Sequence, residues 1–498
     1  MNTARGRRWH VWLGAVVVAL GVLLGGLIGS GHVRSYDVWW HLQLGQDILR
    51  THEIGLYDDY SHSARGNFRP PQQWLFEVLQ AAVYGGVGET GLVWLRMVLA
   101  AASLGLLGAL LIRRRSAYLA ATAMLVLVAS ASMPNVTCRP HLVMPLLLLA
   151  LLSILIGSNK RRWLQWLTPL VFVLWANLHA SLVLGLGIVG AWMVYRACGG
   201  GDKIGDGLRW SGQGLAEAAG VLVASLAGSM VNPAGVKLLT YSLKYLPGGE
   251  YEYAAQAVQE WQAPTLGSFD MAATTLVLVG GALLILLRAR QVSVFELLVV
   301  GLMVVMGLRW GRAAMPAAIV IAWVVTPVLS EWLRGVSPAL LGWSRGSENE
   351  PEKLLPPALV IVMLVGVAAI SRPVLAKRSL DVNLFPVAAT DWIESHDLAG
   401  NMYNPYHWGG YLIHRLYPRH RVFIDGRVDM YGEKVFKDWL TLREARDGWE
   451  EIASKYGVKW GLAEVDVALT EAVRSSANWQ VMYEDPQAVV FVRRDLWE

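Results

Sequence analysis

The N-terminal part of the chain joins a long apolar run to a segment dense in titratable and aromatic residues. Residues 9–28 read WHVWLGAVVVALGVLLGGLI, and residues 35–63 read SYDVWWHLQLGQDILRTHEIGLYDDYSHS. The apolar run is long enough to cross a hydrocarbon core of about 30 Å as a helix. Because it exceeds a typical signal-peptide core and no clear small-residue cleavage site follows it, we predict an uncleaved first membrane span.

Composition extends this interpretation to most of the chain. Of its 498 residues, 54% are hydrophobic and only 16% are charged, and the mean hydropathy is +0.39. Apolar runs of about 17–25 residues recur, which indicates a polytopic membrane protein. The net charge of +5 does not indicate nucleic-acid binding, because Lys and Arg cluster beside the apolar runs, where they set topology. The two cysteines, Cys138 and Cys198, fall near opposite membrane faces, so no disulfide is expected.

We predict eleven membrane-spanning helices. They cover residues 9–30, 90–112, 116–133, 141–158, 163–178, 180–198, 214–231, 270–288, 293–308, 313–330 and 355–371. Basic clusters such as 5–8, 113–115 and 160–162 then fall on one side of the membrane, which identifies that side as the cytoplasm. The N-terminus is therefore expected inside, and the odd number of spans places the C-terminus outside.

The largest polar segments lie on the outer side in this topology. The first outer segment, 31–89, carries two predicted amphipathic interfacial helices. Positions spaced i, i+3, i+4 and i+7 from Asp37 share one face of the first helix, and residues 73–84 form the second. Chemistry, where the chain has any, is expected to face outward.

The C-terminal tail, from about residue 381 onward, changes character to a charged sequence typical of a small α/β domain. Its predicted strands cover 420–426, 458–465, 479–484 and 488–494, and its predicted helices cover 387–396 and 467–476. The predicted fold class is a polytopic α-helical membrane protein of about 11 transmembrane helices with a C-terminal extracytoplasmic α/β domain. The predicted domains are a transmembrane domain, 1–371, which includes the first outer segment, and an extracytoplasmic domain, 372–498.

Asp37 is the first candidate for chemistry. It stands a few residues past the outer end of the first span, where a carboxylate can act as general base on an acceptor hydroxyl or amide. An N-cap role for the helix that follows fits the same residue, and position alone favours the cap. Trp40 and His41 are candidates for substrate binding, although an aromatic belt and a solvated histidine account for them at least as well.

Asp58 and Asp59 are a second pair of acidic candidates. Two adjacent carboxylates suit a divalent cation or an acceptor group, and they also suit a turn before an interfacial helix. The sequence leaves both interpretations open.

Polar residues gather at the outer ends of the predicted spans. They are Arg139 and His141, Asn177 and His179, and Arg309 and Arg312. Ionisable residues near a membrane-embedded cavity are costly and often functional, and a guanidinium suits a phosphate because it makes paired charge-assisted hydrogen bonds. A snorkelling interfacial side chain explains each residue alone, but it explains three separate span ends less well.

Two further places attract attention. Glu260 and Trp261, within QEWQAP, are candidates for a saccharide site because tryptophan faces stack on sugar C–H surfaces, although an interfacial anchor explains Trp261 without a ligand. In the tail, 408–411 is a candidate tight turn and 425–427 ends a predicted strand, where α/β folds often bind ligands. Structural packing explains both tail motifs equally well. The chain has no Walker A, HExxH or CxxC motif, which disfavours ATP-driven transport and zinc proteolysis.

These motifs, in this order, resemble the GT-C superfamily of membrane glycosyltransferases. The segments DVWWHLQLGQDIL, HEIGLYDDYSHS and QQWLFEVL are similar to the first outer loop of the bacterial RgtA/B/C/D-like group and of protein mannosyltransferases. RPHL, WANLHAS, VNPAG, QEWQAP, the Arg309–Arg312 pair and the tail's WGGYLIHRLYPRHRVFIDGR look like further landmarks of bacterial members. Two departures are that no Glu follows Asp37 and that the tail has no Trp-Trp-Asp, so the resemblance to oligosaccharyltransferases is more distant.

The resemblance implies an inverting enzyme of the bacterial cytoplasmic (inner) membrane that transfers a sugar outside the cytoplasm. Its donor would be a polyprenyl-phosphate sugar, and its acceptor an envelope glycan, lipid or protein. Asp37 matches the catalytic base, and Asp58 or Asp59 matches a second acidic position of the family. Metal dependence varies in the superfamily, which leaves open whether Mg²⁺ or Mn²⁺ takes part.

The residues at the span ends complete the set of candidate roles. Arg139, His179, Arg309 and Arg312 are expected to bind the donor phosphate, and Trp40, His41, Asn177, Glu260 and Trp261 the rest of the substrate. A transporter or flippase of lipid-linked saccharides is the first alternative, but the span centres are almost wholly Leu, Val, Ala and Gly. A non-catalytic envelope-assembly protein that binds glycans through its tail is the second alternative.

Overall fold

The computed structural model describes residues 2–31, 35–201, 203–244, 253, 261–265, 267, 271–336 and 382–496. The chain forms two compact units, each assembled from three stretches of sequence. Unit 1 comprises Met1–His32, Thr90–Gly235 and Val258–Ser379, and unit 2 comprises Val33–Glu89, Val236–Ala257 and Leu380–Glu498.

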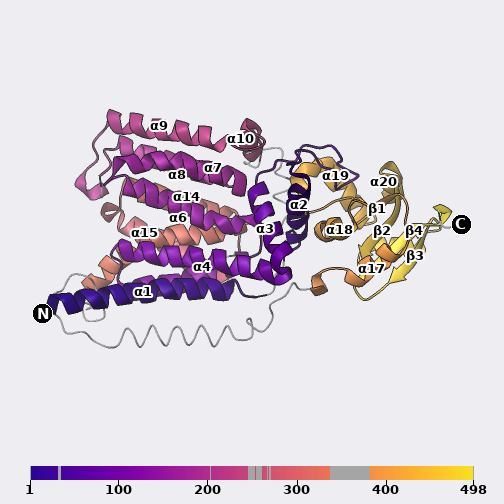
Figure 1. Ribbon diagram of the computed structural model, residues 1–498, viewed down its shortest axis with the longest axis horizontal. Helices are drawn as coiled ribbons and strands as arrows, with labels where there is room; N and C mark the ends of the chain where they lie inside the picture. The colour runs from indigo at the N-terminus through magenta and orange to yellow at the C-terminus, as the bar shows by residue number, and fades with distance from the viewer. Residues whose placement is uncertain are drawn as a thin grey trace. The chain divides into compact units, whose positions relative to one another are not determined.

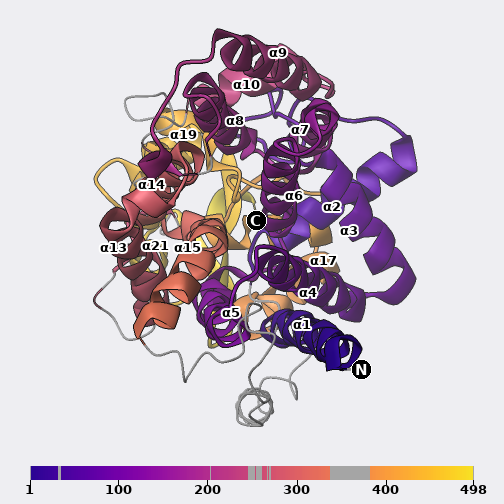
Figure 2. The ribbon, with the colours of Figure 1, turned by 90° about the vertical axis from the view of Figure 1, so that its left-hand side faces the viewer.

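Unit 1 is a bundle of apolar helices, which Figure 1 shows from the side and Figure 2 closer to end-on. Its helices are α1 Asn2–Ile28, α4 Glu89–Arg113, α5 Tyr118–Ser132, α6 Met144–Gly157, α7 Thr168–Leu178, α8 Leu182–Ala197, α9 Gly212–Ser229, α12 Ala272–Thr275, α13 Gly281–Leu287, α14 Val294–Arg309 and α15 Ala314–Val336. A π-helical segment, Leu276–Gly280, joins α12 to α13. Helix α15 packs against α5 and α14, and α9 packs against α7 and α8.

Small residues allow α1 and α4 to lie in backbone contact. Gly21 and Gly25 are one helical turn apart on α1. A methyl group at these glycines would lie 2.4 Å from the main-chain oxygen of Leu104 and 2.3 Å from that of Ala100. Close approach of this kind supplies the van der Waals contact that holds apolar helices together where hydrophobic burial cannot.

The helices of unit 1 agree in position with the predicted spans. Each of the first ten predicted spans overlaps one of these helices, with the α12–α13 pair counted together, and the eleventh, 355–371, lies outside the described residues. Among the described residues, four helices are long and apolar enough to cross a membrane: Glu89–Arg113, Tyr118–Asn135, Pro140–Gly157 and Gly311–Arg334. Three shorter apolar helices are Trp12–Ile28, Leu182–Ala197 and Ala272–Leu287. The count of eleven stays a prediction.

Unit 2 combines helices with a four-stranded sheet. Its helices are α2 Val38–Thr51, α3 Trp74–Val87, α10 Val236–Leu243, α17 Val387–Ser395, α18 Gly409–Leu416, α19 Val428–Arg443, α20 Trp449–Lys455 and α21 Ala468–Ser475. Its strands are β1 Asn401–Tyr403, β2 Val458–Glu464, β3 Trp479–Glu484 and β4 Ala488–Arg493, in the order β1-β2-β4-β3. β1 runs parallel to β2, and the other pairs are antiparallel. Buried Tyr403, Phe423, Trp479 and Phe491 belong to the core beside this sheet.

Most of the elements predicted for the tail are confirmed. β2, β3, β4, α17 and α21 occupy the predicted places. The predicted strand at 420–426 is wrong: Val422 makes only an isolated parallel bridge with Ser61, and the sheet takes Asn401–Tyr403 as its edge strand instead. The reason is competition for backbone groups, because the Asn404 side chain binds Phe423 N and Ile424 O at 2.7 and 2.8 Å.

The motif at 408–411 is not the tight turn with exposed rings considered from sequence. Trp408 is buried, and Gly409 begins α18. Both Gly409 and Gly410 approach neighbouring backbone, since a methyl group at Gly409 would lie 2.1 Å from Ile424 O and one at Gly410 would lie 3.0 Å from Tyr36 O. The glycine pair therefore serves close packing.

The α2–α3 segment (Val33–Glu89) belongs to the same compact unit as the tail. From sequence we grouped it with the membrane spans. Its Trp39 ring stacks on His414 at 4.9 Å between centroids and meets Tyr411 edge-on at 5.5 Å, which explains the association with α18. The two predicted helices of this segment are confirmed as α2 and α3. The predicted boundary at 371/372 lies outside the described residues.

Candidate active site

Asp37 stands at the N-cap position of α2. Its backbone carbonyl accepts from His41 N at 3.3 Å, and its side chain makes no capping hydrogen bond. The backbone is helical there, with φ −81° and ψ −16°. The carboxylate is therefore not committed to the cap that the sequence favoured.

The tail backbone lies directly against this carboxylate. A methyl group at Gly426 would lie 2.2 Å from Asp37 Oδ1 and 3.1 Å from Trp40 Nε1. A methyl group at Gly410 would lie 2.9 Å from Trp40 Cδ1. Glycine at both positions thus lets the tail reach the turn that carries Asp37.

His41 and Trp40, the predicted substrate contacts beside Asp37, are buried. His41 is 3% exposed, and its Nδ1 lies 3.0 Å from Glu77 Oε1 on α3. Trp40 is 7% exposed, and its ring centroid lies 3.5 Å from that of His41. Gln80 Nε2 donates to Val38 O at 3.2 Å, so the polar stripe of α3 faces inward and fixes the start of α2. These contacts make His41 and Trp40 part of the support for Asp37.

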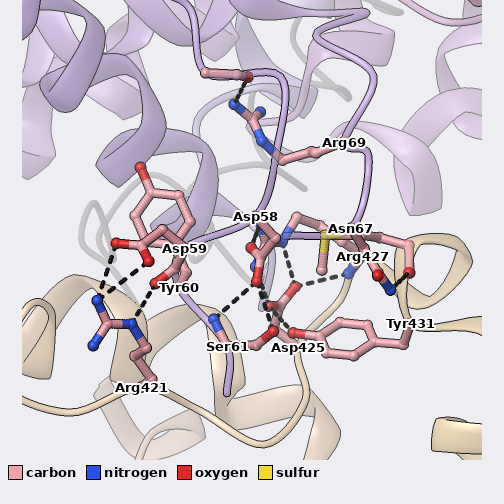
Figure 3. Close-up of polar contacts among 12 residues, drawn as sticks. Asp58, Asp59, Tyr60, Ser61, Asn67, Arg69, Arg421, Asp425, Arg427 and Tyr431 are labelled. Atoms are coloured by element: carbon pink, nitrogen blue, oxygen red, sulfur yellow. Dashed lines mark hydrogen bonds and ion pairs between the residues drawn. The ribbon is translucent and has the colours of Figure 1, made fainter. Parts of the chain in front are cut away.

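Asp58 is at the centre of a buried polar network (Figure 3). Arg427 Nη1 donates to Asp58 Oδ1 at 2.8 Å, and the backbone N and hydroxyl of Ser61 donate to Asp58 Oδ2 at 3.0 and 2.6 Å. Arg427 also donates through Nε and Nη2 to Asp425, at 2.7 and 2.5 Å. The Tyr431 hydroxyl donates to Asp425 Oδ2 at 2.5 Å. One guanidinium therefore joins a carboxylate of the α2–α3 segment to a carboxylate of the tail.

The charges in this network stabilise one another. Burial alone would raise the pKa of the Asp425 carboxyl, but the Arg427 guanidinium and the Tyr431 hydroxyl lower it below its ordinary value. Burial opposes the charged form of Arg427, yet Asp425 and Asp58 raise the pKa of the guanidinium well above its ordinary value. Burial and the Asp425 charge raise the pKa of Tyr431, which keeps its hydroxyl protonated as a donor.

Asp59 lies in a more exposed ion-pair network, of which Figure 3 draws the pair with Arg421. Arg421 Nη2 donates to its two oxygens at 3.2 and 3.1 Å, Arg65 Nε donates at 2.8 Å, and the Tyr417 hydroxyl donates at 2.9 Å. Burial raises the pKa of the Asp59 carboxyl, but the donors Arg421, Tyr417 and Arg65 together lower it below its ordinary value. Adjacent aspartates thus have different surroundings.

In unit 1, Asn177 and His179 stabilise the turn between α7 and α8. Asn177 Nδ2 donates to Val173 O at 2.8 Å and to Val231 O at 2.7 Å. His179 Nδ1 accepts from Ser181 N at 3.1 Å, so in this arrangement a neutral ring carries its proton on Nε2. Both predicted residues are partly committed to local structure.

The arginine candidates of unit 1 lie at helix ends. Arg139 precedes the 3₁₀ turn Pro140–Val143. Arg309 lies in the last turn of α14 with an exposed side chain. The Arg312 guanidinium carbon lies 3.2 Å from the centroid of the Trp261 ring, a cation–π contact that brings two predicted residues together. Glu260 lies outside the described residues.

No protein-family model and no curated protein sequence matches the chain. Solved structures do. The archaeal oligosaccharyltransferase AglB from Archaeoglobus fulgidus, in complex with an inhibitory peptide and a dolichol-phosphate, matches with a TM-score of 0.65 and 12% identity over 92% of this chain and 70% of that one. The same organism's enzyme tethered to an acceptor peptide with the NVT sequon matches at 0.61 and 12%, over 92% and 69%.

The chain shares the fold of this archaeal oligosaccharyltransferase. The likeness at 12% identity is one of fold, and it covers both the helix bundle and the tail because 92% of the chain is aligned. This fold and the apolar helices together indicate a multi-pass membrane protein.

A divalent cation at Asp58 and Asp59 does not fit the contacts that these two side chains make. A third match, the A. fulgidus enzyme in complex with Zn and sulfate, has a TM-score of 0.59 and 11% identity over 91% of this chain and 68% of that one. Here both oxygens of each aspartate accept hydrogen bonds, and each carboxylate pairs with an arginine. Within the described ranges, no group of three or more His, Cys, Asp or Glu side chains is placed to hold a metal ion. Both aspartates are therefore ion-pair partners of arginines.

Sequence reasoning missed the partners of Asp58. Asp425, Gly426 and Arg427 were noticed as the end of a predicted strand, but nothing local connects Arg427 to Asp58, which lies 369 residues away along the chain. Likewise, nothing local in the sequence pairs Glu77, within the predicted second helix 73–84, with His41. The one available signal was an acidic-glycine-basic triplet inside an aromatic, apolar stretch, where charged residues are seldom buried without partners.

We expect the two adjacent aspartates to differ in their effect on stability. Asp58→Asn should lower the free energy of unfolding by about 3 kcal/mol, because it removes one charge partner from a buried guanidinium. Asp59→Asn should cost less than about 1 kcal/mol, because exposed pairs contribute little. Thermal unfolding of the two purified full-length variants provides the measurement, and equal shifts would contradict the burial difference.

Proposed function

We propose that the chain is a membrane glycosyltransferase that transfers a sugar from a polyprenyl-phosphate-linked donor to an acceptor outside the cytoplasmic membrane. The GT-C fold supports this, since matching structures hold a dolichol-phosphate in one case and an acceptor peptide in another. The observation that carries the proposal is the position of Asp37, whose carboxylate makes no cap and lies against the glycine turn of the tail. The acceptor class is an envelope glycan, lipid or protein.

Asp37 is the general base of the proposed reaction. Its carboxylate takes the proton from an acceptor hydroxyl or amide as the acceptor atom forms a bond to the anomeric carbon of the sugar. The bond from that carbon to the phosphate oxygen breaks, and its electron pair leaves on the polyprenyl phosphate. Attack from the face opposite the leaving group inverts the anomeric configuration.

Arginines of unit 1 are the proposed ligands of the donor phosphate. Arg309 is exposed at the end of α14, and Arg312 lies over Trp261. Guanidinium groups make paired, charge-assisted hydrogen bonds to phosphate oxygens, and they stabilise the charge that develops as the phosphate leaves. Arg139 and His179 are proposed to assist at neighbouring span ends. Asp58 and Asp59 take no part in proton transfer, because both oxygens of each carboxylate already accept hydrogen bonds and each carboxylate pairs with an arginine.

The test is an assay with the purified full-length protein and radiolabelled polyprenyl-phosphate sugars. We expect label to move to an acceptor fraction from envelope extracts, with release of free polyprenyl phosphate in equal amount. Reconstitution in vesicles distinguishes a transferase from the alternative, a flippase of the lipid-linked donor. Movement of intact donor across the bilayer without cleavage of the sugar–phosphate bond would contradict the proposal and favour a flippase.

A further inference from the structure

We propose that Arg427 is a positioning residue for Asp37, and that the tail is therefore part of the catalytic site. The inference rests on the proposed function, because it takes Asp37 to be the base. It goes further by assigning a role to a residue that lies 390 positions after Asp37 along the sequence.

The first step is the link between two parts of unit 2. Arg427 is 6% exposed and makes three side-chain hydrogen bonds, one to Asp58 and two to Asp425. The paired bonds to Asp425 have the fork geometry that fixes a guanidinium in direction as well as in distance. The position of the tail turn is therefore tied to the α2–α3 segment.

The second step is the turn itself. Arg427 N donates to Asp425 Oδ1 at 2.9 Å, which closes a short loop around the residue between them. Tyr431 holds the other oxygen of Asp425. Gly426 is thus held on both sides, by an aspartate with a fixed side chain and by an arginine with a fixed guanidinium.

The third step is the contact with the base. Gly426 approaches Asp37 so closely that a methyl group on it would lie 2.2 Å from Asp37 Oδ1. A movement of the turn therefore changes the space that the Asp37 carboxylate occupies. Proton transfer requires the base within hydrogen-bond reach of the acceptor, so such a movement alters the rate.

Other contacts anchor the α2–α3 segment independently of Arg427. Val422 N donates to Tyr60 O at 3.0 Å, and His62 N donates to Val422 O at 3.0 Å. Asn67 Nδ2 donates to Met430 O at 3.0 Å. Because of these anchors, a mild change in the Arg427 network is expected to shift the turn without detaching the segment.

Tyr431→Phe is the mildest test, and Tyr417→Phe is its matched control. Each removes one hydroxyl that donates to an aspartate, at Asp425 in the first case and at the exposed Asp59 in the second. Arg427→Lys keeps the charge but loses the fork. We expect Tyr431→Phe to lower kcat about tenfold with little change in KM for the donor, since misplacing a reacting group by about 1 Å can cost ~10²-fold. Arg427→Lys is expected to lower kcat further, and Tyr417→Phe to stay within about twofold of the parent protein.

If the Arg427 network only stabilised the fold, its variants would change the amount of folded protein but not the rate per folded molecule. The readouts are therefore kcat per folded molecule, with folding measured by thermal unfolding, and the pH dependence of kcat, whose acid limb should shift in Tyr431→Phe and Arg427→Lys. Unchanged kcat and an unchanged acid limb in both folded variants would overturn the inference. If Asp37→Asn transfers sugar at the parent rate, Asp37 is not the base and this inference fails with it, whereas a parent protein that releases no polyprenyl phosphate would contradict the proposed function itself. If Asp37→Asn is inactive while the other two variants are normal, only this inference fails.

Discussion

We expect Asp37→Asn to lower kcat for sugar transfer by about 10²–10⁴-fold, the range that a general base contributes. Asparagine has the size of aspartate but cannot take a proton. Because the Asp37 side chain makes no capping hydrogen bond, α2 should keep its stability in this variant. The donor KM should change little, because the proposed phosphate ligands Arg309 and Arg312 lie elsewhere in the chain.

The measurement is single-turnover transfer from a radiolabelled polyprenyl-phosphate sugar by the purified full-length variant, beside a thermal unfolding curve. Asp59→Asn is the matched control, since it makes the same chemical change in the same segment at an exposed ion pair. A folded Asp37→Asn protein that transfers sugar at the parent rate would remove the base from the proposed mechanism. A loss of rate in the control as large as that in the variant would point to a general effect of charge.

The parts of the fold that follow from periodicity were predictable. Apolar runs mark the helices of unit 1, and alternating or amphipathic patterns mark β2, β3, β4, α17 and α21. The start of α2 was predictable too, because a helical pattern begins directly after Asp37, although the Asp37 side chain makes no capping hydrogen bond. In each case the deciding information lies within about 20 residues of sequence.

The parts of the fold and of the site that depend on partners distant in the sequence could not be predicted. The segment at 420–426 has a strand-like pattern, but its backbone groups bond to Asn404 and to the α2–α3 segment. Asp58 and Asp59 look equivalent in sequence, and only the pairing of one with buried Arg427 separates them. Membership of the α2–α3 segment in the tail's unit likewise depends on contacts such as Trp39 with His414. The local sequence pattern does not predict such long-range contacts.

The glycines of the tail also have a role that their local sequence does not reveal. From sequence, a glycine pair and an Asp-Gly step indicate turns. In the structure, Gly426 is needed because there is no room for a side chain beside Asp37 Oδ1 and Trp40 Nε1. Its φ is not among the positive values of the described glycines, so alanine would meet no backbone penalty there. The cost of a substitution is then the collision with Asp37 alone.

We therefore expect Gly426→Ala to lower kcat by about 10²-fold, because its methyl group must displace the Asp37 carboxylate by about 1 Å or more. Gly410→Ala, whose methyl group would meet Trp40 Cδ1 at 2.9 Å, should have a smaller effect, because Trp40 supports the base without being the base. Gly86→Ala, in α3, is the control, since a methyl group there meets nothing within 4 Å and alanine favours the helix.

The three glycine variants are best compared by kcat per folded molecule, with thermal unfolding measured on each. The expected order of loss is Gly426→Ala, then Gly410→Ala, with Gly86→Ala equal to the parent protein. Folded Gly426→Ala with the parent kcat would show that the Asp37 carboxylate works from another position, and the link from Arg427 through Gly426 to the base would then fail. If Gly426→Ala is less stable than Gly410→Ala but retains its rate, the close contact serves packing of the tail on α2 and not the orientation of the base.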